Sequence, residues 1–152
     1  MQILVFSDSH NNVAPMLIKI RELKPDLILH LGDYVSDARI LSESFPDLPL
    51  KMVRGNCDFS SKAPLLEEFE LESHRIIMTH GHRYDVKSGL TALCDMGHFA
   101  NAALLLFGHT HVPYYEQIGN MHVLNPGSAG QQKSAAFIEL AEGHIRCAHV
   151  SL

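Results

Sequence analysis

Residue types that bind metal ions occur as two short pairs far apart in the chain. Asp8 and His10 flank one residue, and His109 and His111 flank another. Each pair follows an apolar run typical of a β-strand. On an extended segment, side chains two positions apart project to the same side. We therefore expect each pair to offer two ligands to one cleft.

Three more apolar runs also end in a potential ligand, at Gly32-Asp33, Gly55-Asn56 and Thr79-His80-Gly81. Each alone is explained by turn chemistry. Together, five strand ends that finish in Asp, His or Asn, several beside a glycine that allows close backbone approach, indicate a metal site. The 11 histidines point the same way, because imidazole is the commonest transition-metal ligand in proteins.

Composition narrows the class of protein. With 152 residues, 46% of them hydrophobic, the chain can bury one core, so we expect residues 1–152 to form a single domain. The net charge of −5 and the lack of a basic cluster argue against nucleic acid as the main partner. No apolar run approaches about 18 residues, which predicts no membrane partner and no export signal. Three cysteines without CxxC spacing favour a cytoplasmic location.

The pattern of apolar runs predicts the elements that must position the ligands. Residues 2–6, 27–31 and 50–53 are predicted strands, with helices over 12–23 and 37–44 between them. This alternation predicts right-handed crossovers and a parallel sheet.

After residue 56 the pattern changes. We expect strands at 65–71, 75–79 and 103–107, a helix at 87–99, and four antiparallel strands at 113–118, 121–125, 135–140 and 145–150. The expected fold is α/β with two sheets, helices outside, and ligands at the carboxyl ends of the strands.

The ordered motifs resemble those of the calcineurin-like metallophosphoesterases. They are DxH at Asp8, GD at Asp33, GN at Asn56, H beside G at His80, and GHTH from Gly108 to His111. The stretch Asn125-Pro126-Gly127-Ser128 resembles the small prokaryotic YfcE-like phosphodiesterase branch. The resemblance implies a four-layer α/β/β/α sandwich with two mixed sheets.

The resemblance also implies a binuclear metal centre. One ion would be held by Asp8, His10, Asp33 and His111, and the second by Asp33, Asn56, His80 and His109. Asp33 would bridge, since a carboxylate can hold two cations about 3.5 to 4 Å apart. Nitrogen and oxygen ligands without thiolate favour manganese, with nickel, iron, cobalt or zinc as alternatives.

A hydroxide that bridges the two ions would then attack phosphorus, with Asp33, Asn56 and His109 as the catalytic residues. Two divalent ions, two carboxylates and one hydroxide leave roughly one positive charge, which matches a monoanionic diester. We therefore predict a hydrolase acting on a small phosphodiester. Asp58 is a further catalytic candidate, which either orients a ligand or closes the turn.

One position departs from the family pattern. Many relatives have histidine after the GN motif, where this chain has Cys57. A thiol with an ordinary pKa near 8.5 is a poor leaving-group acid. We therefore expect faster cleavage of aryl than of alkyl diesters. His82 is a candidate for the missing acid, and a supporting role beside the ligands is its alternative.

Two other functions stay open. One is a phosphomonoesterase, and the other is a non-catalytic interaction module that resembles the retromer scaffold subunit of this family. All seven ligand positions are filled here, which argues against the module. The sequence is compatible with a homo-oligomer and identifies neither the physiological substrate nor the native metal.

Overall fold

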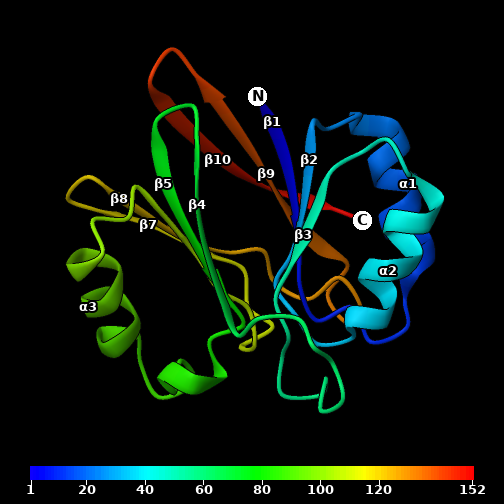
Figure 1. Ribbon diagram of the computed structural model, residues 1–152, viewed down its shortest axis with the longest axis horizontal. Coiled ribbons are helices and arrows are strands. Elements are labelled where there is room, and N and C mark those ends of the chain that lie inside the picture. The colour runs from blue at the N-terminus through cyan, green and yellow to red at the C-terminus, as the bar shows by residue number, and fades with distance from the viewer.

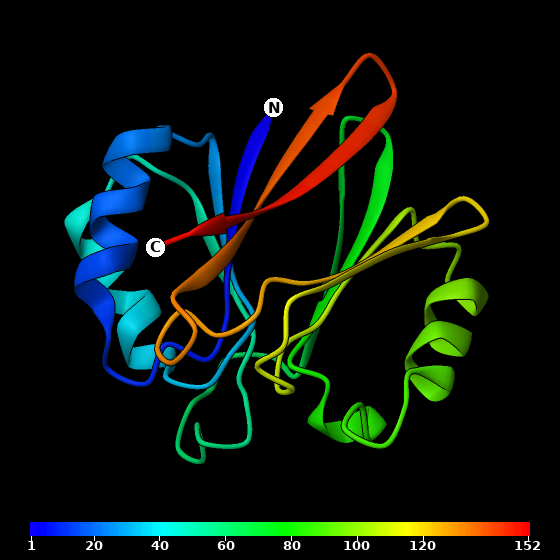
Figure 2. The same ribbon diagram turned by 180° about the vertical axis from the view of Figure 1, so that it is seen from behind.

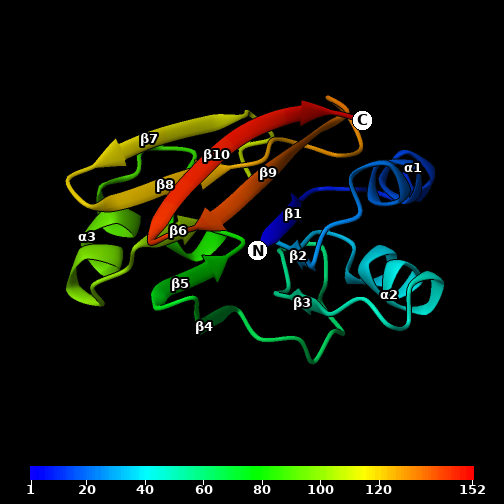
Figure 3. The same cartoon turned by 90° about the horizontal axis from the view of Figure 1, so that it is seen from above.

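Two five-stranded sheets pack face to face between helices in the computed structural model, which describes residues 1–152 (Figure 1). The helices α1 (Val13–Leu23) and α2 (Val35–Ser44) cover one sheet, and α3 (Thr91–Phe99) covers the other. Seen from above, the order is helix, sheet, sheet, helix (Figure 3). The expected α/β/β/α sandwich is confirmed.

Both sheets are mixed, as expected. The first runs β10 (His144–Ser151), β9 (Ser134–Ala141), β1 (Gln2–Phe6), β2 (Leu27–His30) and β3 (Leu50–Met52). The second runs β4 (Leu66–Leu71), β5 (His74–Thr79), β6 (Leu104–Leu106), β8 (Met121–Asn125) and β7 (Tyr114–Ile118). The parallel pairings are β1 with β2, β2 with β3, β5 with β6 and β6 with β8.

The apolar runs are continuous because the central strands are buried on both faces. In β1, Ile3 and Val5 enter the core between the sheets, whereas Leu4 and Phe6 pack under the helices. Each of these side chains is fully buried. At about 25 cal/mol per Å² of buried apolar surface, this double coverage is the main stabilisation of the sandwich.

The carboxyl ends of β1, β2, β3 and β5 meet at one edge of the sandwich, the lower edge in Figures 1 and 2. Backbone hydrogen bonds join the loops that leave them. The amide of Asp8 donates to the carbonyl of Gly32 at 3.0 Å, and the amide of Gly108 donates to the carbonyl of His80 at 3.0 Å. Side chains from distant parts of the sequence are therefore held in one place.

Two helix boundaries differ from the prediction. The helix expected at residues 87–99 begins only at Thr91, because the preceding segment forms turns, with the amide of Ser88 bonded to the carbonyl of Asp85. The helix expected from residue 37 begins at Val35. None of the helices has the length and apolar character needed to cross a membrane.

A buried hydrogen-bond network holds the loop after β1. The His30 ring accepts the amide of Gly32 at Nδ1 (3.3 Å), so its proton is on Nε2, which lies 3.2 Å from the Ser9 hydroxyl. That hydroxyl donates to the Asp37 carboxylate at 2.7 Å, which also accepts the amide of Asn11 at 2.8 Å. The hydrogen bonds of His30 therefore support the loop, and we assign His30 no role as a metal ligand.

We expect His30 to make stability depend on pH. Its complete burial, partly offset by the charge of Asp37, lowers its pKa from 6.5 to about 4. Below about pH 6.5 His30 is protonated in the unfolded chain but stays neutral in the folded chain. The free energy of unfolding therefore decreases as the pH falls toward 4. The free energy of unfolding should drop by roughly 2 kcal/mol between about pH 7.5 and about pH 4.5 from this group alone.

Urea denaturation of His30→Gln across this range measures the effect. Glutamine keeps a donor and an acceptor but does not titrate, so the variant should lose stability less steeply than the wild type. The same change at the exposed His144 should leave the wild-type slope in place. Equal slopes for wild type and His30→Gln would contradict the assignment of this pH dependence to His30.

Candidate metal centre

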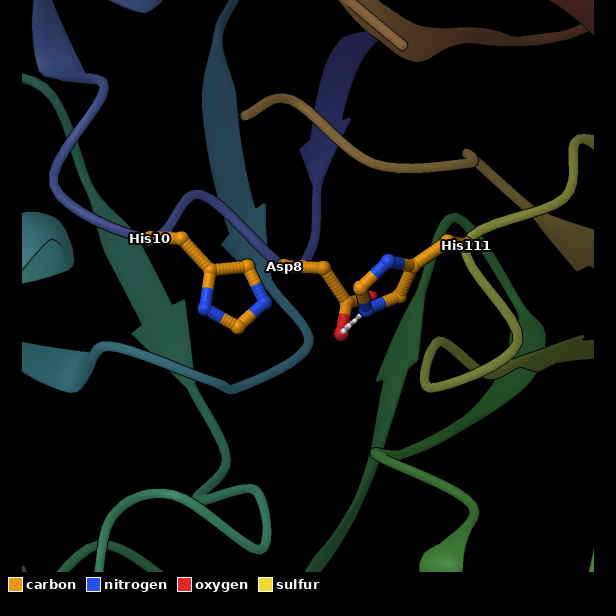
Figure 4. A group of neighbouring side chains, drawn as sticks. All are labelled: Asp8, His10 and His111. Atoms are coloured by element: carbon orange, nitrogen blue, oxygen red, sulfur yellow. Dashed lines mark ion pairs between the residues drawn. The ribbon is translucent and has the colours of Figure 1, made fainter. Parts of the chain in front are cut away.

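Six of the seven expected ligands form two groups of three. The groups are Asp8 with His10 and His111, and Asp33 with His80 and His109. Within each group, one ligand atom from every residue lies within 4.8 Å of the others. Figure 4 shows the first group, in which the loop after β1 and the loop after β6 bring their side chains together.

The first group contains buried polar atoms that lack a partner. The Oδ1 atom of Asp8 and the Nε2 atom of His10 are buried without a hydrogen bond. His111 Nε2 lies 3.1 Å from that Asp8 oxygen, a contact that is an ion pair only if the imidazole is protonated. An unsatisfied buried polar group costs about 1 to 3 kcal/mol. A divalent cation would satisfy both atoms, so the residues fit a metal ion.

The second group is oriented by the chain around it. His80 Nδ1 is 2.8 Å from the carbonyl of Leu31, which fixes the ring and directs Nε2 toward the Asp33 carboxylate at 3.5 Å. The other Asp33 oxygen accepts the amide of Cys57 at 2.8 Å. Asn56, the seventh expected ligand, joins this group, with Oδ1 3.1 Å from His80 Nε2.

The two groups are neighbours. His80 Nε2, of the second group, lies 3.9 Å from Asp8 Oδ1 in the first. The backbone amide of His109 donates to Asp8 Oδ2 at 3.1 Å, and the Ser7 hydroxyl donates to the same oxygen at 2.6 Å. Both carboxylates therefore face one polar space at the sheet edge.

The electrostatics leave Asp33 and His109 in forms that can bind a metal, whereas His80 would have to lose its proton to an incoming cation. Burial acts to raise the pKa of Asp33, but its hydrogen bond with His80 holds that pKa well below the usual range. Burial acts to lower the pKa of His80, but the Asp33 and Asp8 carboxylates outweigh it and raise it. Burial, with the charges of His80 and Lys87, lowers the pKa of His109 to about 4. Asp33 is thus ionised and His109 neutral near pH 7, as metal binding requires.

The expectation that the two motif pairs are extended is wrong. Asp8, His10, His109 and His111 have φ values of 53°, 46°, 67° and 63°, which is the left-handed region. The alternation of an extended strand therefore does not apply. Asp8 and His10 still reach one group, but His109 and His111 reach different groups, because the chain turns between them. Such strained backbone is held by its surroundings and is common at functional sites.

Glycines allow the loops to approach the carboxylates, as the sequence predicted. A Cβ atom added to Gly55 would lie 2.1 Å from Asp33 Oδ1, and one added to Gly108 would lie 2.0 Å from Ser7 Oγ. Neither position has room for a side chain. The glycines of the GN and GHTH motifs are therefore required by packing around the ligands.

Asp58 closes a turn. Its Oδ1 accepts the amides of Tyr34 (3.0 Å) and Val35 (2.8 Å), and its Oδ2 accepts the amide of Gly55 (2.8 Å). Of the two roles expected for Asp58, the structure shows this one. These bonds satisfy the first amides of α2, so this helix begins earlier than predicted.

Cys57 and His82 lie beside the second group. Partial burial and the neighbouring Asp33 carboxylate raise the pKa of the Cys57 thiol to about 11, which makes it a weaker acid than an ordinary cysteine. The His82 ring centre is 5.4 Å from that of His80 and 6.1 Å from that of His109. His82 is therefore adjacent to the ligands.

Three supporting contacts complete the site. Asn125 Nδ2 donates to the carbonyl of Gly108 at 2.9 Å, and the Ser128 hydroxyl donates to the carbonyl of Asp8 at 2.9 Å. Gln131 Oε1 is 3.0 Å from His111 Nδ1 and orients that ring. Sequence reasoning missed Gln131, because it lies in a turn without motif or periodicity.

Comparison with known proteins gives matches over most of the chain. The family model for the calcineurin-like phosphoesterase superfamily domain matches residues 1–144. The crystal structure of a conserved protein from Streptococcus pneumoniae TIGR4, a predicted phosphoesterase, superposes with a TM-score of 0.84 at 30% identity over 99% of this chain and 88% of that one.

Two curated relatives carry different names. Vacuolar protein sorting-associated protein 29 of Schizosaccharomyces pombe is 32% identical over 145 residues, which cover 91% of this chain and 78% of that protein. Phosphodiesterase YfcE of Escherichia coli K12 is 36% identical over 89 residues, 53% of this chain and 45% of that protein. This chain is thus similar both to a protein named as a phosphodiesterase and to one named as a sorting protein.

Proposed function

This chain belongs to the calcineurin-like phosphoesterase superfamily, and we propose that it is a metal-dependent phosphodiesterase acting on small phosphodiesters. The observation that carries the proposal is the pair of neighbouring three-residue donor groups at one sheet edge. The unpartnered Asp8 and His10 atoms in the first group support it.

We assign two divalent ions to this edge. The first would be held by Asp8, His10, Asp33 and His111, and the second by Asp33, Asn56, His80 and His109. Asp33 is the shared ligand in this proposal. Manganese is the favoured metal, with nickel, iron, cobalt or zinc as alternatives, because the donors are imidazole nitrogens and oxygens without thiolate.

When bound, such ions lower the pKa of a water molecule and polarise the phosphoryl oxygens, so the protein needs no nucleophile of its own. The residues supply position and charge. Leu31 and Gln131 hold the rings of His80 and His111, and the carboxylates of Asp8 and Asp33 limit the net positive charge of the site. A singly charged diester suits that balance better than a doubly charged monoester.

A substrate series tests the proposal. With manganese added, bis(p-nitrophenyl) phosphate should be cleaved at least about tenfold faster than p-nitrophenyl phosphate. An alkyl p-nitrophenyl diester should release p-nitrophenol but not its alkyl alcohol, because Cys57 is a poor acid and general acid catalysis is typically worth about 10² to 10⁴ in rate. Preferred monoester cleavage would establish the phosphomonoesterase alternative, and rapid alkyl release would show that another acid is present.

The interaction module is kept as the second candidate because of the sorting-protein relative. Both donor groups are complete here, and this fits a metal-dependent enzyme at least as well as it fits an interaction module. A lack of ester cleavage with each of the five metals would favour the module.

The free cysteines Cys57, Cys94 and Cys147 fit the cytoplasmic location that we also propose.

A further inference from the structure

A small cleft adjoins the second donor group. It has a volume of about 280 Å³, and its lining includes Arg54, Asn56, Phe59, His82 and Arg83. Asn56 belongs both to this lining and to the proposed ligand set. The His82 ring lies 5.4 Å from that of His80 between ring centres. A substituent on a phosphate held at the second donor group would therefore reach this cleft.

The cleft carries a net positive charge. The carboxylate ion pairs of lysine and arginine involve Lys19, Lys51, Arg75 and Arg146, so Arg54 and Arg83 have none. Arg54 Nη1 donates to the carbonyl of Ser61 at 3.1 Å, which positions its guanidinium and leaves other N–H groups free. Arg54, Arg83 and His82 line the same cleft, so both guanidinium groups share it with that ring.

The acidic residue of the lining, Asp58, offsets only part of this charge, because two arginines face one carboxylate and neither arginine forms an ion pair with it. Both oxygens of Asp58 already accept backbone amides. In a chain with a net charge of −5, two unpaired arginines beside a phosphate site are an anion-binding feature. A planar guanidinium matches a phosphate group in geometry as well as in charge.

Phe59 supplies the second kind of contact. Its side chain is 93% exposed, so it contributes almost nothing to the core. An exposed aromatic ring at the edge of a cleft offers a face on which a flat ring can stack, and stacking of a base on such a ring is worth a measurable gain in binding.

We propose that this cleft makes the enzyme specific for nucleotide-like diesters that carry a second phosphate group. Arg54 and Arg83 bind that additional phosphate, and Phe59 stacks against the base. This inference rests on the proposed phosphodiesterase function, and it assigns the selectivity to residues outside the metal ligands.

The test compares the p-nitrophenyl ester of thymidine 5′-phosphate with the same ester that also has a 3′-phosphate. The wild type should favour the 3′-phosphorylated ester by about tenfold in kcat/KM, as expected for charge-assisted hydrogen bonds. The Arg54→Gln, Arg83→Gln double variant should bring this ratio close to one. Phe59→Ala should lower kcat/KM about threefold or more for both nucleotide esters relative to bis(p-nitrophenyl) phosphate.

Lys62→Gln is the control, because Lys62 is exposed on the same loop but is absent from the cleft lining. It should keep the wild-type ratio. A ratio of one in the wild type, or an unchanged ratio in the double variant, would overturn the inference while the diesterase function stands.

A binding measurement separates the two proposals. Thymidine 3′,5′-bisphosphate is titrated into chelator-treated protein by calorimetry, and the double variant should bind it about tenfold more weakly than the wild type. If no ester is cleaved with any metal, the proposed function fails, and this titration still tests the cleft. Equal affinities for wild type and double variant would refute the proposal that Arg54 and Arg83 bind the additional phosphate.

Discussion

The Asp33→Asn variant is expected to lose at least about 10³-fold in kcat/KM for bis(p-nitrophenyl) phosphate while it remains folded. Asn is similar in size but has no charge and only one oxygen, so it cannot serve two cations. The Asp33 carboxylate also makes the contact with His80. Metal analysis should show fewer than two ions per chain, and circular dichroism should show an unchanged fold.

Asp85→Asn provides the matched control. Asp85 is exposed and has a φ of 49°, a conformation that Asn tolerates, so its activity should stay within about twofold of the wild type. Substantial turnover by Asp33→Asn with two ions bound would show that Asp33 is not the shared ligand.

Metal removal is expected to have the second large effect. Dialysis against a chelator should abolish diester cleavage, and manganese should restore it. Manganese should also stabilise the fold, because bound ions would satisfy Asp8 Oδ1 and His10 Nε2, which are buried without a hydrogen-bond partner. At one hundred times its Kd, a ligand of the folded state adds about 2.7 kcal/mol to the free energy of unfolding. Thermal unfolding with and without manganese measures this gain.

Two variants localise the stabilising ion. The His10→Ala, His109→Ala double variant removes one imidazole from each donor group, so manganese should no longer raise its midpoint of unfolding. His144→Ala changes an exposed histidine at the start of β10 and should retain the full shift. A similar shift in both variants would place the bound manganese outside the donor groups.

The layers of the fold could be predicted because burial leaves a clear pattern in the sequence. A strand covered on both faces, such as β1, must be apolar at successive positions, and that run is visible without the structure. The helix at residues 87–99 was predicted too long, because the propensities of its first residues are mixed, with Lys87 a good helix former and Gly89 a poor one, and the chain forms turns there. Local propensity does not report such tertiary preferences.

The site was predicted at the level of residue types and motifs. Asp, His and Asn at strand ends are uncommon enough in combination to indicate a metal centre, and the glycines beside Asp33 and Ser7 are needed at the close approaches observed. The prediction failed on local geometry, because it assumed extended backbone at His109 and His111. Backbone torsions at a turn depend on partners that lie far away in sequence.

The amino-acid sequence was therefore sufficient for the order of strands and helices, the apolar core and the choice of candidate donor residues, since each depends on residue type and near spacing. The left-handed backbone at the ligand positions, the contact of Gln131 with His111, and the placement of Arg54, Phe59 and Arg83 around one cleft emerge only in the folded molecule. These features join segments separated by many residues, and sheet packing and loop hydrogen bonds set their distances.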